Sequence, residues 1–272
     1  MKVIAAINGS LVSESSAFLA LNYAKNQGID LILLHVKNHK DDISEVQNSA
    51  SRIKAAADDL QLNCETVILK GHIKEAIKEY LEPLHIDSFF CSTRMHKNFI
   101  TNSFSEAILK MKLNTNIAVI RIVHSHQFKE LSSILLPIKE TKLSVYKFTF
   151  VSTLASTYKS NVHILSISTT SKNHLAKQTL STLRERSAHI NFQLRHYLNL
   201  ARLMPFKLNI KHDFSTNESN SILKYMAAHD SQLVIIGAKR LSFFSLFKGE
   251  KPIERLMRET STNLIAFYPK ED

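Results

Sequence analysis

The sequence predicts two tandem α/β domains, each with a five-stranded parallel sheet, related to each other by a pseudo-twofold axis. Strand-like segments alternate with helix-like segments along the whole chain. These strand segments are apolar without a regular period of two, as expected for strands that helices cover on both faces. The same order of segments also occurs twice, which indicates a repeated domain.

The first half opens with a strand, a helix and a second strand. Residues 2–10, KVIAAINGS, form an apolar run that enters a glycine turn. Residues 13–28 have helical periodicity, and residues 30–36, DLILLHV, form a second apolar run. This order is typical of a βαβ unit with two parallel strands.

The second half repeats this unit at a constant offset of 131 residues. Residues 132–141, SSILLPIKET, match the first strand, so that Asn8 is equivalent to Lys139. Further along, residues 71–94 match residues 216–240, now at an offset of 145. We therefore expect an N-terminal domain at 1–124 and a C-terminal domain at 125–272.

The change of offset predicts an insertion of 14 residues in the second helix of the second half, within residues 173–205. If this helix is continuous over about 30 residues, it is about 45 Å long. It carries a basic face that could dock a partner, but we favour a longer solvated helix whose apolar stripe covers its own sheet. The cations of this face are Lys177, Arg184, Arg186, Arg195 and Arg202.

The composition and the missing motifs argue against several classes of protein. Cys64 and Cys91 lack metal-ligand spacing, which indicates buried thiols in a reducing compartment, and no apolar run approaches the ~20 residues of a membrane span. We expect a cytoplasmic protein. The net charge of +11 allows a polyanionic partner, but no zinc-finger, RNP or KH signature accompanies it. No nucleophile elbow, HExxH or Walker A motif is present, so we expect no enzymatic activity.

The order of these motifs resembles the universal stress protein family in a tandem two-domain form. The matching pieces are INGSLVSESS (7–16), GHIKEAI (71–77), NSFSEAIL (102–109), ILLPIKET (134–141) and VIIGAKR (234–240). The resemblance implies an adenine nucleotide α-hydrolase-like fold in each half. An electron-transfer flavoprotein subunit is the nearest alternative of similar architecture, but it would not recur as two compact halves.

The resemblance also implies where a nucleotide would bind in the second half. ATP-binding members have a glycine-rich loop after the fourth strand, because backbone N–H groups must approach the phosphates closely. Here Gly237 keeps the first glycine position, whereas Arg240 replaces the second. Other candidates are Lys139 in place of the acid that follows the first strand, Glu140 beside it, and Lys239, Gly249, Glu250 and Lys251 in the loop.

The first half departs further from the ATP-binding pattern. Its loop is three residues shorter and lacks all three glycines, leaving Asn102 and Ser103 at the start of the following helix. At the end of the first strand, Asn8, Gly9 and Ser10 are the candidate ligand groups. Asn and Ser are also common helix N-caps, which explains them without a ligand. We expect no ATP in this half.

The loop of the second half combines cations with large apolar residues. Phe243, Phe244, Leu246 and Phe247 are more apolar than a phosphate loop requires and favour a contact surface. We therefore expect a stress-response binding or signalling protein with degenerate nucleotide loops, acting through self-association or another protein. Two alternatives stay open: regulation by ATP or AMP bound in the C-terminal half, and a basic module that binds polyanions.

Overall fold

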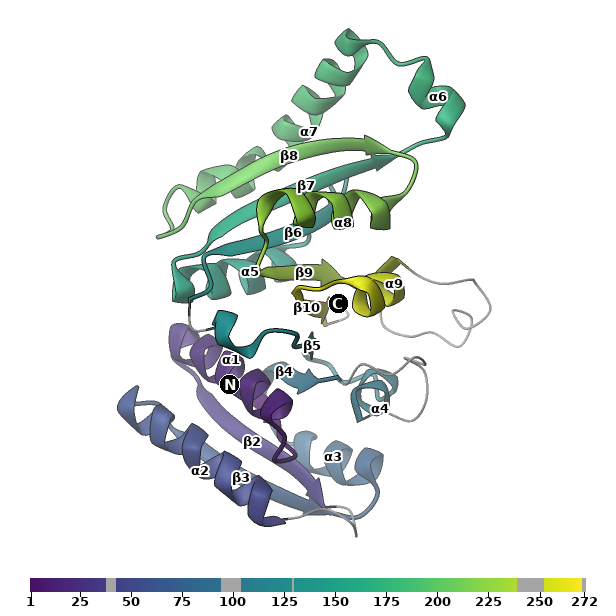
Figure 1. The fold of residues 1–272 in the computed structure, drawn as a ribbon. Helices are drawn as coiled ribbons and strands as arrows, with labels where there is room; N and C mark the ends of the chain where they lie inside the picture. The colour runs from purple at the N-terminus through teal and green to yellow at the C-terminus, as the bar shows by residue number, and fades with distance from the viewer. Residues whose placement is uncertain (38–42, 94–103, 129, 239–251, 271–272) are drawn as a thin grey trace. The chain divides into compact units, whose positions relative to one another are not determined.

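The computed structural model describes residues 1–37, 43–93, 104–128, 130–238 and 252–270 (Figure 1). The chain forms two compact units. One contains Met1–Phe128 together with Ile265–Asp272, and the other contains Lys129–Gly237 together with α9 (Pro252–Glu259). The predicted boundary between residues 124 and 125, and the predicted pseudo-twofold axis, stay predictions.

The first half contains the five predicted strands in the order β3-β2-β1-β4-β5, and every pairing recorded among them is parallel. Nearly every residue of the central strand β1 is buried, since helices cover both faces of the sheet. The strands are β1 (Lys2–Ala6), β2 (Asp30–Lys37), β3 (Cys64–Lys70), β4 (Ile86–Ser92) and β5 (Asn116–Arg121).

Four helices cover this sheet as right-handed crossovers require. Helix α1 packs against α2, and α3 packs against α4, so each pair covers one face. The largest buried side chains between the layers include Phe89 and Phe90. The helices are α1 (Leu11–Gln27), α2 (Ile43–Asp59), α3 (Ile73–Leu81) and α4 (Phe104–Lys110).

The second half contains five more strands after a short 3₁₀ helix, η1 (Ser125–Phe128). Four of them follow the order β9-β6-β7-β8, with parallel pairing throughout. The strands are β6 (Ser133–Lys139), β7 (Asn161–Thr169), β8 (Leu208–Ser215), β9 (Leu233–Gly237) and β10 (Asn263–Tyr268). Over the residues that the structure describes, the prediction of five strands in each half is confirmed.

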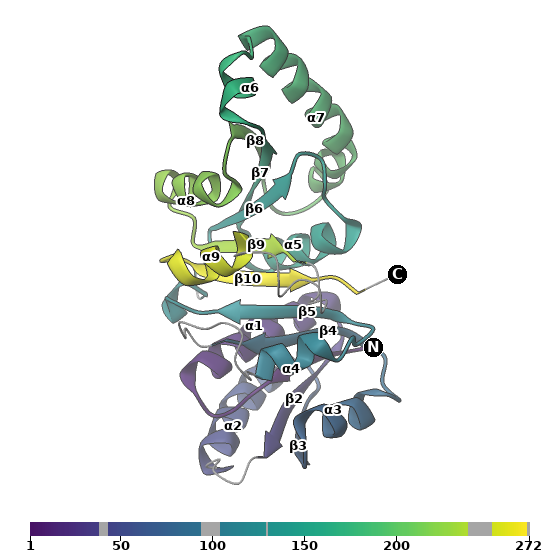
Figure 2. The ribbon, with the colours of Figure 1, turned by 90° about the vertical axis from the view of Figure 1, so that its right-hand side faces the viewer.

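Helices lie on both sides of these strands as well. Figure 2 shows α5 and α7 on one side of β6 and β9, with α8 and α9 on the other. Strand β6 pairs with β9 at Ile134 and Leu135, before Pro137, which has no N–H to donate. The new helices are α5 (Val145–Tyr158), α6 (Lys172–Ala176), α7 (Leu180–Ala201) and α8 (Glu218–His229).

Strand pairing confirms the internal repeat residue by residue. Lys2 pairs with Asp30 in the first half, and Ser133 pairs with Asn161 in the second. The two residues of each pair are the same number of positions apart, so β1 pairs with β2 in the same register as β6 pairs with β7. The predicted offset of 131 residues therefore describes equivalent positions in the sheet.

The inserted residues fall where the change of offset places them. Leu31 of β2 pairs with Cys64 of β3, and the equivalent Val162 of β7 pairs with Leu208 of β8. Cys64 and Leu208 are 144 positions apart, so 13 of the 14 extra residues lie between β7 and β8. Both cysteines of the chain are buried free thiols, as expected.

The helix of this insertion is not continuous. Helix α6 ends at Ala176, and α7 begins at Leu180 after a separate N-cap. The Thr179 side chain accepts a hydrogen bond from the N–H of Thr182, whose hydroxyl in turn accepts one from the N–H of Thr179. This reciprocal capping box starts a new helix. At 22 residues, α7 is about 33 Å long.

Candidate ligand-binding sites

The residues that follow β1 bond to one another. The side-chain oxygen of Asn8 accepts hydrogen bonds from the N–H of Ser10 at 3.1 Å and from its hydroxyl at 2.7 Å. The Ser10 hydroxyl oxygen accepts one from the N–H of Ser13 at 3.3 Å. Ser10 is thus the N-cap of α1, the role that its position favours without a ligand.

Gly9 has a structural reason to be glycine. Its backbone φ angle is +81°, a value that residues other than glycine rarely adopt. A Cβ atom at this position would lie 2.8 Å from the Cβ of Glu45 and 3.1 Å from the backbone nitrogen of Val46. The first turn of α2 therefore occupies the space beside Gly9, where the sequence predicts a ligand contact.

Glu140 connects the end of β6 to the inserted helix. Its carboxylate accepts a hydrogen bond from Arg186 of α7. Its backbone is held from the next strand, because its N–H donates to Ile167 at 3.0 Å and its carbonyl accepts from the hydroxyl of Ser166 at 2.8 Å. Its neighbour Lys139 is exposed. Arg186, which the sequence reading assigned to a docking face, is thus partly engaged within the fold.

Gly237, at the end of β9, lies against the side chain of Lys147. A Cβ atom at Gly237 would be 2.2 Å from Cε and 2.3 Å from Nζ of Lys147. Burial lowers the pKa of this ammonium group below its ordinary value of 10.5, an effect that Glu218 partly opposes. Within the described part of the chain, the Lys147 ammonium forms no hydrogen bond or ion pair. The carboxyl end of β9 therefore lies beside the partly buried ammonium group of Lys147.

Sequence reasoning missed Lys147, although a signal for it exists. The residue lies in the first turn of α5, whose apolar sequence VYKFTFV is otherwise typical of a buried helix. Its equivalent in the first half is Ser16, and the equivalent of Gly237 is Ser92. A large side chain opposite a glycine thus replaces two small side chains.

Seven of the predicted site residues lie outside the described part of the chain. The others fall at two strand edges: Asn8, Gly9 and Ser10 after β1, and Lys139, Glu140 and Gly237 at the ends of the neighbouring strands β6 and β9. Residues outside the description are Asn102, Ser103, Lys239, Arg240, Gly249, Glu250 and Lys251. Their predicted role stays a prediction.

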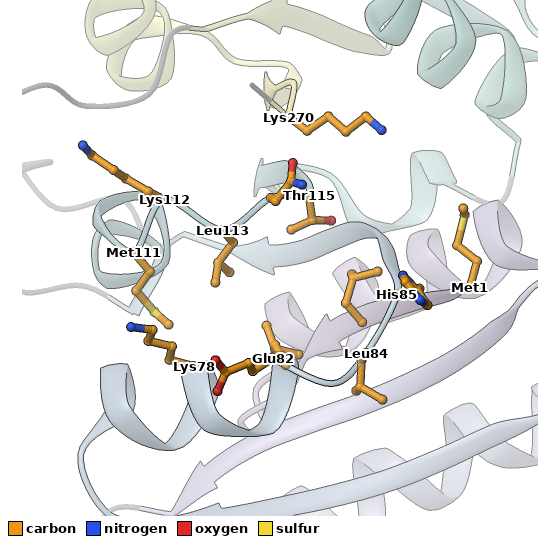
Figure 3. A pocket seen from close by; sticks show the side chains of 13 residues that line it. Met1, Lys78, Glu82, Leu84, His85, Met111, Lys112, Leu113, Thr115 and Lys270 are labelled. Carbon is orange, nitrogen blue, oxygen red and sulfur yellow. The ribbon is translucent and has the colours of Figure 1, made fainter. Parts of the chain in front are cut away.

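A surface cavity of about 490 Å³ lies at the other edge of the first unit, where β4 and β5 begin (Figure 3). None of the predicted site residues lines it. Met111 and Leu113 point toward α3, which carries Lys78 and ends before Glu82, whereas Lys112 points away. The lining combines apolar side chains with charged ones of both signs, and the charged side chains are exposed to solvent: Lys78, Glu82, Lys112 and Lys270. This geometry singles out no ligand.

Two further kinds of site are absent from the described ranges. No group of three or more His, Cys, Asp or Glu residues there could hold a metal ion. Among the same residues, no helix combines the length and apolarity that a bilayer crossing requires.

Comparison with solved structures shows which known proteins share this fold. No protein-family model matches the chain, and no curated protein matches its sequence. A universal stress protein from Archaeoglobus fulgidus has a similar structure, with a TM-score of 0.61 at 14% identity, covering 100% of this chain and 98% of its own. A putative universal stress protein from Pseudomonas aeruginosa gives a TM-score of 0.62 at 11% identity, covering 99% and 93%.

The chain thus has the fold of universal stress proteins over its whole length, as the motif resemblance implies. The cytoplasmic domain of a prokaryotic cation chloride cotransporter is also similar, with a TM-score of 0.61 at 11% identity, covering 99% of this chain and 95% of that one. One architecture therefore serves different proteins, and function has to be argued from the sites.

Proposed function

We propose that this chain is a cytoplasmic, non-enzymatic member of the tandem universal stress protein type, with domains at 1–124 and 125–272, that acts through protein contacts. Its nucleotide loops are degenerate. The observation that carries the proposal is that, at both strand edges, the chain's own side chains and helices engage the groups that a nucleotide would need.

In the first half, both the hydrogen-bonding groups and the space are taken. The oxygen of Asn8 already accepts two hydrogen bonds from Ser10, and Ser10 caps α1. The first turn of α2 lies within 3 Å of where a side chain at Gly9 would begin. A phosphate would have to break the cap or displace the helix, and either change opposes binding.

In the second half, Lys147 lies against Gly237, the glycine that keeps its motif position. A glycine at the end of the fourth strand serves nucleotide binding by letting a phosphate approach the backbone. Here the Lys147 side chain lies against Gly237 instead. The engagement of Glu140 by Arg186 removes a second polar group from this edge.

Analysis of bound small molecules tests the proposal. We expect mass spectrometry of the denatured full-length protein to release no stoichiometric adenine nucleotide, and calorimetry with ATP or AMP to give no binding heat. Sedimentation of the same sample should show self-association, or affinity capture should yield a protein partner. A stoichiometric nucleotide in the purified protein would refute the proposal.

Nucleotide binding in the C-terminal half is the second candidate, and the Lys147 ammonium favours it. A half-buried cation without a hydrogen-bond acceptor in the described structure attracts an anion. Lys147→Met should then abolish ATP or AMP binding, whereas Lys159→Met, at the other end of α5, should not change it.

The basic loop offers a second test. Replacing Lys239, Arg240 and Lys251 with Ala should reduce nucleotide affinity, while replacing Phe243, Phe244 and Phe247 with Ser should weaken association.

A further inference from the structure

The turn between α7 and β8 exposes large apolar side chains. Leu203 is 83% exposed, Leu200 46% and Met204 40%. Three such residues within five positions differ from the scattered exposed leucines of an ordinary surface. Together with Arg202 and Lys207 they form what we term the α7–β8 surface.

The chain holds this turn in one conformation. Ala201 on one side and Phe206 on the other are buried. Between them, the N–H of Leu203 donates to Leu200 at 3.0 Å, and the N–H of Met204 donates to Ala201 at 3.1 Å. Because both ends are anchored, the Leu203 and Met204 side chains cannot turn inward to the core.

The surroundings of this turn are strongly basic. From Arg186 through His212, both included, the sequence contains five Arg or Lys residues and no Asp or Glu. Arg186 is paired with Glu140. The other four cations form no ion pair in the part of the chain that the structure describes; they are Arg195, Arg202, Lys207 and Lys211. A partner with negative charge would complement them.

We propose that the α7–β8 surface docks the protein onto the surface of an acidic lipid bilayer. Aliphatic side chains flanked by Arg and Lys suit this partner, since the apolar tips enter the acyl boundary while the cations remain at the phosphate level. A nucleic acid would instead favour planar side chains that stack on bases, and the turn presents leucine and methionine. Two or three apolar side chains give only reversible attachment, so binding depends on the cations as well.

Vesicle sedimentation tests the proposal with the full-length protein. Vesicles of phosphatidylcholine with about 30% phosphatidylserine should retain the protein, whereas pure phosphatidylcholine vesicles should not. Raising the salt from about 0.05 to about 0.5 M should release it. Arg202→Gln with Lys207→Gln should lower the partition coefficient about fivefold for each cation removed. Leu203→Ser with Met204→Ser should lower it about tenfold.

Matched variants serve as controls. Val145→Ser removes an apolar side chain that is 65% exposed elsewhere in the second half, and Lys142→Gln with Lys172→Gln removes two exposed cations. Neither change should alter binding, and unchanged melting curves should show that all variants fold. Binding to neutral and acidic vesicles alike would overturn the proposal. Full binding by the Leu203 and Met204 variant, with release by duplex DNA, would instead identify a polyanion site.

Discussion

Lys147 and Gly237 fit together only because one of them has no side chain. The ammonium end of Lys147 lies where the Cβ atom of any other residue at position 237 would be. The equivalent positions of the first half hold two small residues, Ser16 and Ser92. The two residues should therefore be coupled in stability.

A double-mutant cycle measures that coupling. Gly237→Ala should destabilise the wild-type protein by about 0.5 to 1.5 kcal/mol, because the new methyl group displaces the flexible end of Lys147. The same substitution in a Lys147→Ala background should cost less. Urea unfolding of the four proteins gives the coupling free energy, and equal costs in both backgrounds would show that the two side chains do not compete for space.

Removal of the Lys147 charge should stabilise the fold at neutral pH. Since burial lowers its pKa in the folded state, the unfolded state binds more protons between that pKa and 10.5. The destabilising effect of the charge is thus fully present at lower pH and declines as pH rises through this window. Lys147→Met should be more stable than wild type at pH 7, and the difference should shrink toward pH 10.5. A difference that grows with pH would have the wrong sign.

Gly9 should tolerate substitution least among the glycines with positive φ. Gly9→Ala meets both an unfavourable φ of +81° and the backbone of Glu45 and Val46, so we expect a loss of about 2 to 4 kcal/mol. Gly28 supplies the matched control, because its φ is +65° and no atom lies within 4 Å of its added Cβ. Gly28→Ala should cost about 1 kcal/mol. Thermal unfolding compares them, and equal losses would contradict the packing argument.

The ion pair of Glu14 and Arg52 should stabilise the fold only at pH values where the Glu14 carboxyl group is ionised. The Arg52 guanidinium donates to Glu14 at 2.8 Å from Nε and 2.5 Å from Nη2, and this hydrogen bonding lowers the pKa of Glu14 below 4.5. A depressed carboxyl pKa gives stability that is present above 4.5 and lost as pH falls through the folded value. Arg52→Met should therefore destabilise the protein at pH 7, and the difference should shrink as the pH falls below 4.5. Acid titrations followed by circular dichroism would detect it.

The strands and the repeat could be predicted because each rests on a local pattern. Apolar runs such as residues 30–36 become buried strands whatever surrounds them, and an equal offset in the sequence becomes an equal register in the sheet. The N-cap role of Ser10 was equally accessible, since it depends only on neighbours in the chain.

The contacts between distant segments could not be predicted in the same way. The break before α7 depends on the pairing of Thr179 with Thr182, a weaker signal than the helical periodicity on either side of it. The position of Lys147 depends on where α5 lies relative to β9, and neither sequence segment contains that information alone. Glu140 likewise appeared as a possible ligand contact because its partner Arg186 is 46 residues away.

The equal spacing of the two strand pairs limits the ways in which the two halves could have diverged. If the halves descend from one duplicated gene, the connection between β7 and β8 changed length afterwards without shifting the hydrogen-bonding phase of either strand. The outer layer of this fold can then evolve independently of its sheet. A chimera could carry the shorter first-half connection in place of the α6–α7 segment. It should keep the sheet and lack the α7–β8 surface.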